Sequence, residues 1–99
     1  MMQLPPGFSK WDVTDYLKTN EDIILFLEAC FEEGGDDAAF IAAALGEVAR
    51  ARGMASIAEA TGLTREGLYR TLSKQGNPSF SAVLKVLKAL GIRLRPEAA

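Results

Sequence analysis

Arg65 and Arg70 carry the most specific chemistry in this 99-residue sequence. A guanidinium group can form two hydrogen bonds to a guanine base, a contact worth about 1–3 kcal/mol of discrimination between bases. If residues 65–73 form a helix, the two arginines share its exposed side with three further polar residues. These are Thr64, Glu66 and Tyr69. A helix that exposes this set is suited to the major groove of DNA.

The sequence IAEATGLTREGLYRTL, from Ile57 to Leu72, predicts the corner that positions this helix. A short helix ends at Gly62 and a second begins after Thr64, which leaves one apolar seam between them. The seam consists of Ile57, Ala58, Leu63, Leu68 and Leu72. Gly62 can adopt a positive φ at the corner, and Thr64 can cap the second helix. The pattern predicts a helix-turn-helix, although by itself it fits equally well a helical corner buried in another all-α domain.

Apolar periodicity, caps and glycines predict an all-α chain with five helices, at about 20–33, 37–52, 54–61, 65–73 and 79–90. Residues 1–18 are predicted to form an N-terminal arm, and residues 19–99 a single domain. The alternation in Ile92–Arg95 predicts a short C-terminal strand. Because a lone strand leaves its edges unpaired, we expect it to pair with the arm or with its copy in a dimer.

Composition excludes several classes of function. Hydrophobic residues make up 48% of the chain, but no run of eighteen apolar residues and no basic-then-apolar leader occurs. We therefore expect a cytoplasmic protein that does not enter a membrane. One cysteine, Cys30, and no histidine exclude an internal disulfide, a His-paired nucleophile and a Cys/His zinc site within one chain. We expect no enzyme activity, catalytic residue, metal or cofactor, and we interpret the Asp36–Asp37 pair as a helix cap.

Charge divides the chain into two halves. Residues 1–49 hold two lysines against ten acidic residues, a net charge of −8, whereas residues 50–95 hold nine basic residues against two acidic ones, a net charge of +7. The basic half contains the predicted helix-turn-helix. This distribution favours phosphate as a partner for the basic half and a basic protein as a partner for the acidic half.

Longer segments carry a resemblance to known families. The helix-turn-helix sequence, the loop SKQGNPSF and the helix SAVLKVLKALG resemble the lambda-repressor-like (XRE/Cro) family. With WDVTDYLKTNEDIILFLEACFEEG and DDAAFIAAALGEVARARGM, residues 10–95 resemble, more narrowly, the addiction-module antidote proteins, which are similar to the HigA group. The resemblance implies a type II antitoxin with two activities. It would neutralise a small basic RelE-type toxin by binding it, and it would repress its own promoter by binding double-stranded operator DNA.

The resemblance also implies roles for single residues. Thr64, Arg65 and Glu66 match the base-facing start of the family's recognition helix, and Tyr69 and Arg70 match its second exposed turn. Three more residues match positions that contact phosphate, namely Lys74, Asn77 and Ser79. Met54 stands where the broad family often has a glutamine, and since methionine cannot donate that hydrogen bond, Ser56 is the candidate on this helix.

We place the predicted toxin contact in the acidic half, at Trp11, Tyr16 and Phe26, although Trp11 and Tyr16 could instead cover the protein's own core. A homodimer is expected, through the last helix or the Ile92–Leu94 strand, because one recognition helix covers only a few base pairs. Two alternatives remain: a phage-type XRE transcriptional repressor without a toxin partner, and a toxin-binding inhibitor that does not bind DNA.

Overall fold

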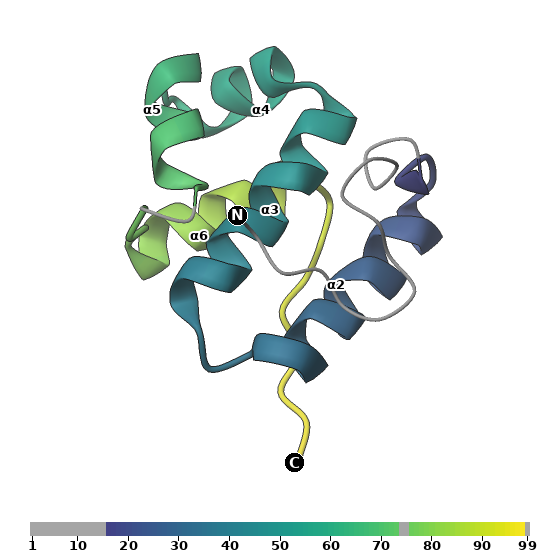
Figure 1. Cartoon of the computed structure of the whole chain (residues 1–99). Helices are drawn as coiled ribbons and strands as arrows, with labels where there is room; N and C mark the ends of the chain where they lie inside the picture. The colour runs from purple at the N-terminus through teal and green to yellow at the C-terminus, as the bar shows by residue number, and fades with distance from the viewer. Residues whose placement is uncertain (1–15, 74–75, 99) are drawn as a thin grey trace.

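The computed structural model describes residues 16–73 and 76–98, and in these ranges the chain is all-α. Five helices follow one another, α2 (Asn20–Gly34), α3 (Ala38–Arg52), α4 (Met54–Thr61), α5 (Arg65–Thr71) and α6 (Phe80–Ala89). Helix α3 lies at the centre, with α2 on one side and α4 and α5 on the other (Figure 1). Helix α4 packs against α3, α5 and α6. The predicted arm lies almost entirely outside the described residues.

Short polar side chains cap four of the five described helices, and α4 begins after Gly53 without a side-chain cap. Thr19 and Asp22 form a reciprocal capping box at α2, and Asp37 Oδ1 accepts hydrogen bonds from the amides of Ala39 and Phe40 at α3. Thr64 caps α5 in the same way, and Ser79 caps α6. Each cap satisfies amide donors that the first turn of a helix leaves unpaired. The capping role predicted for the Asp36–Asp37 pair is confirmed for Asp37.

One continuous core joins the helices. Its fully buried side chains come from α2, α3, α5 and α6 and include Phe26, Cys30, Leu45, Val48, Leu68 and Val86. Two residues that helical periodicity places in the apolar stripe of α6 instead face outward, Phe80 at 69% and Leu84 at 42% exposure. Periodicity could not exclude them, because they lie beside the buried row of α6 on an edge that no described helix covers.

The prediction of a C-terminal strand is wrong within the described residues. After α6, Gly91 takes a positive φ of 75°, and the Ile92 amide donates to the Leu87 carbonyl oxygen at 2.9 Å. The segment then runs extended away from α6 without strand pairing (Figure 1). Alternating residues form a strand only where a neighbouring strand supplies hydrogen bonds, and none of the described residues does so.

Helix α5 approaches α3 closely at Gly46, a buried glycine in the middle of α3. A Cβ atom added there would overlap the carbonyl oxygen of Leu72, the residue that ends α5. The absence of a side chain at position 46 therefore sets how closely the end of α5 can pack on α3.

Candidate functional site

The corner between α4 and α5 has the predicted geometry. Gly62 adopts a φ of 78°, in the left-handed region that favours glycine. Its amide and that of Leu63 donate to the Ala58 carbonyl oxygen, at 2.9 Å and 3.1 Å. Three residues thus turn the chain between Thr61 and Arg65, and they satisfy the open carbonyl at the end of α4.

A buried threonine that the sequence interpretation did not single out supports the same corner. The Thr61 hydroxyl donates to the Ile57 carbonyl oxygen at 2.8 Å, and its oxygen accepts from the Leu63 amide at 3.4 Å. This pairing leaves the hydroxyl satisfied although the residue is buried. The position of Thr61 directly before the corner glycine, Gly62, is the sequence signal that could have predicted this role.

Helix α5 separates its anchors from its exposed residues. Leu68, within the helix, and Leu72, which ends it, are buried, while Thr64 Oγ1 accepts from the Gly67 amide at 2.9 Å and fixes the first turn. The structure leaves all five predicted residues of this segment exposed, namely Thr64, Arg65, Glu66, Tyr69 and Arg70. Within residues 16–73 and 76–98, no ion pair joins either arginine to Glu66. Both guanidinium groups are therefore available to a ligand.

Arg50 adds a contact that sequence reasoning missed. From the end of α3 its guanidinium carbon lies 5.5 Å from the centre of the Tyr69 ring, within the range of a cation–π interaction. Arg50 also forms an ion pair with Glu47 at 2.7 Å. The contact links the end of α3 to Tyr69 of α5, and it places a guanidinium, itself paired with Glu47, beside the exposed residues of α5.

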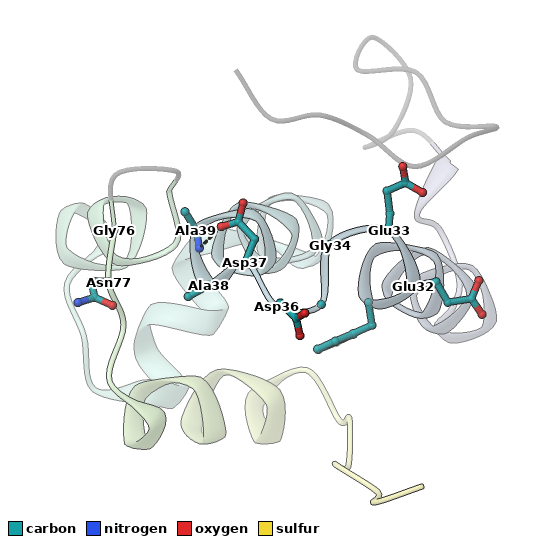
Figure 2. A pocket seen from close by; sticks show the side chains of 11 residues that line it. Glu32, Glu33, Gly34, Asp36, Asp37, Ala38, Ala39, Gly76 and Asn77 are labelled. Atoms are coloured by element: carbon teal, nitrogen blue, oxygen red, sulfur yellow. Dashed lines mark hydrogen bonds between the residues drawn. The ribbon is translucent and has the colours of Figure 1, made fainter. Parts of the chain in front are cut away.

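The residues predicted to contact phosphate are less uniform in their surroundings. Ser56 is exposed on α4, and Lys74 lies outside the described residues. Ser79 is exposed, and its Oγ accepts from the Ala82 amide at 3.0 Å as the cap of α6. Asn77 lines an open hollow of about 730 Å³ (Figure 2). Four carboxylates share that hollow, those of Glu32, Glu33, Asp36 and Asp37. Their negative charge disfavours a phosphate beside Asn77.

The residues predicted to contact a toxin also differ from one another. Trp11 lies outside the described residues, and Tyr16 is exposed. Phe26 is fully buried on the inner side of α2, so its ring offers no surface to a partner. The exposed apolar residues of α2 are instead Ile24, Leu25 and Phe31. Sequence reasoning placed Phe26 on the wrong side because the apolar stripe of α2 extends over both sides of the helix.

No metal or thiol chemistry emerges from the described part of the chain. Burial raises the pKa of the Cys30 thiol to about 11, so the thiol stays protonated near neutral pH and is a poor nucleophile. Across the two described ranges, no group of three or more acidic, cysteine or histidine side chains could hold a metal ion. None of the helices there is long and apolar enough to span a bilayer.

The fold and the site together define a class: a small chain, all-α in the residues that the structure describes, with an arginine-bearing helix on one side and an acidic, partly apolar helix on the other (Figure 1). Residues 7–98 match the family model described as "Probable addiction module antidote protein", and the chain belongs to this family. A protein of Haemophilus influenzae described as uncharacterized is 45% identical over 85 residues, which cover 86% of each chain. No solved structure matches the chain.

Proposed function

We propose that this protein is the antitoxin of a type II toxin–antitoxin module. It neutralises a RelE-type toxin by binding it, and it represses its own promoter by sequence-specific binding to operator DNA. Neither activity requires catalysis by this chain. Membership of the antidote family supports the toxin partner, and the proposal of DNA binding rests on the residues of α5.

The observation that carries the DNA-binding proposal is the division of the corner into anchors and exposed residues. Gly62 turns the chain, and Leu68 and Leu72 fasten α5 to the core. In a lambda-repressor-like helix-turn-helix, α4 and α5 would be its two helices, and α5 would enter the major groove. The helix is seven residues long, a length that suits it to reading a few neighbouring base pairs.

The chemistry of the exposed residues matches base edges. Arg65 and Arg70 would donate paired hydrogen bonds to guanine, and Glu66 would accept from cytosine or orient an arginine. Thr64 has a hydroxyl hydrogen left to donate, because its oxygen serves the helix cap as an acceptor. Tyr69, under the Arg50 guanidinium, would contact the DNA at the second exposed turn.

Phosphate contacts would come from the residues beside this helix. Ser56 on α4 is the strongest of the proposed set, because it lines an open hollow with Arg52 and Lys88 and with no acidic residue among the described lining residues. Lys74 is proposed from its place in the sequence after α5. Ser79 is exposed at the start of α6. Asn77 is the weakest, because it shares its hollow with four carboxylates.

A two-fold dimer would supply a second recognition helix about 34 Å away along the duplex. Since the described C-terminal segment forms no strand, α6 is the element we propose for the dimer contact. Its outward side exposes Phe80 and Leu84, one helical turn apart. Two such faces can pack against each other around a two-fold axis.

The decisive experiment measures binding of the purified protein to a duplex from its own promoter at two salt concentrations. Removal of one bidentate arginine–guanine contact weakens binding by about 5- to 150-fold, so Arg65→Ala with Arg70→Ala should abolish specific binding. The matched control is Arg93→Ala with Arg95→Ala, which removes the same charge from the exposed C-terminal segment.

The control separates base reading from general charge. We expect it to retain specific binding and to lose only a modest part of the salt-dependent affinity. Equal losses in the two double variants would reject α5 as the reading helix. If the folded wild-type protein does not bind the duplex, the DNA-binding proposal is wrong and the protein acts as an inhibitor of the toxin alone. Specific binding by a protein that ignores the product of the adjacent gene would indicate a repressor without a toxin partner.

A further inference from the structure

The outward side of α2 combines apolar and acidic residues. Ile24, Leu25 and Phe31 are exposed at 43%, 55% and 49%. The inner side of the same helix is fully used, because Ile23, Phe26, Leu27 and Cys30 are buried in the core. The described helices therefore leave a second apolar face of α2 without a cover.

Carboxylates line this second face. Glu21, Glu28 and Glu32 are exposed, and at 100° per residue they lie between the Ile24–Phe31 row and Leu25. Over its full length α2 carries five acidic residues and no lysine or arginine. A partner that covers the apolar residues must therefore also meet a uniform negative charge.

The face has a hollow and a fixed backbone. Asn20, Glu21, Ile24 and Leu25 line a shallow hollow of about 310 Å³ in the first half of α2. The capping box of Thr19 and Asp22 holds the first turn beside it, with bonds of 3.1 Å in both directions. A fixed helix end lowers the ordering cost of binding.

Charge decides between the possible occupants. A second copy that used the same face would oppose the three glutamates of this face with three more, which is unfavourable at short range. Residues 1–15 contain one lysine against two aspartates, so they do not complement the face either. A separate protein with lysines and arginines around an apolar contact satisfies both the charge and the exposed apolar residues.

We propose that the outward face of α2, formed by Glu21, Ile24, Leu25, Glu28, Phe31 and Glu32, is the surface that docks the toxin. The inference rests on the proposed antitoxin function and gives that function a location. Leu25 and Phe31 provide apolar anchors, and the glutamates receive basic side chains of the toxin. Phe26 does not contact the toxin directly, because its buried ring packs α2 against the core.

The test uses the full chain co-expressed with the product of the gene adjacent to its own, and titration of the two purified proteins. We expect Leu25→Ser with Phe31→Ser to weaken the complex at least tenfold. Glu28→Lys with Glu32→Lys is a second variant at two exposed positions, so it tests the face without changing an apolar residue. We expect this charge reversal to weaken the complex similarly, and more so at low salt than at high salt.

Matched controls lie in the C-terminal segment. Leu94→Ser removes an apolar side chain that is 48% exposed, and Glu97→Lys reverses an exposed charge. Both should bind the adjacent gene product as the wild type does. If the wild type fails to bind it, the proposed antitoxin function is wrong. If the wild type binds and both α2 variants bind equally well, the antitoxin function stands and its location on α2 is rejected.

Discussion

Helices α2 and α5 present two exposed faces of opposite chemistry on one core. Both helices begin at a threonine cap, and each has a buried side on the shared core. Helix α5 exposes hydroxyl and guanidinium groups that suit base edges and phosphate, whereas α2 exposes apolar side chains among carboxylates. Similar local scaffolds can therefore present opposite chemistry, because only the exposed residues need to differ.

The largest predicted effect is a difference in stability between variants on the buried and the exposed side of α2. Phe26→Ala removes a fully buried ring and should lower the free energy of unfolding by about 3–5 kcal/mol. Phe31→Ala removes a half-exposed ring of the same type five residues later and should cost less than about 0.5 kcal/mol. Urea denaturation of both variants measures the difference. Similar losses would mean that Phe31 belongs to the core and that the two-sided description of α2 is wrong.

A smaller effect should distinguish the two caps. Thr19→Ala and Thr64→Ala each remove a hydroxyl that accepts a backbone amide at 3.1 Å or 2.9 Å, and each should cost about 1 kcal/mol of stability. Their effects on binding should diverge, because each frays only its own helix. We expect Thr64→Ala to weaken operator binding and Thr19→Ala to weaken toxin binding. If both variants weakened the two activities equally, the independence of the two faces would be disproved.

The smallest effect concerns the Arg50–Tyr69 contact. Arg50→Ala removes an exposed cation–π interaction worth about 0.5–1 kcal/mol, so operator affinity should fall about two- to fivefold. Arg52→Ala is the matched control, since it removes the same charge two residues further along the chain. Titration of the operator duplex with both variants compares them. If the two variants lose the same operator affinity, Arg50 acts only through its charge and does not position Tyr69.

Local sequence signals predicted most of the helical framework. Asp37 and Thr64 cap helices and Gly62 adopts a positive φ, as expected. The same residue types mark other helix ends, at Thr19, Ser79 and Gly91. These features depend on one or two neighbouring residues, so the sequence contains the information directly. The strand at Ile92–Arg95 failed because strand formation depends on a partner segment, which alternation alone cannot supply.

Prediction of the candidate site was limited by contacts between distant segments. The exposure of Arg65 and Arg70 followed from helical spacing, but the approach of Arg50 to Tyr69 depends on how α3 crosses α5. The burial of Phe26 depends on which side of a broad apolar stripe meets α3. Periodicity gives the directions of side chains on one helix, whereas the neighbouring helix decides which direction is inside.

Gly46 limits how the orientation of α5 relative to α3 can change. Helix α5 is about 10 Å long, so a shift at its last residue tilts the entire helix rather than bending it. The Leu72 carbonyl oxygen packs so closely on Gly46 that the glycine leaves no room for a Cβ atom. A larger residue at this buried position must displace Leu72, so the placement of α5 and its exposed arginines depends on a residue that no partner touches.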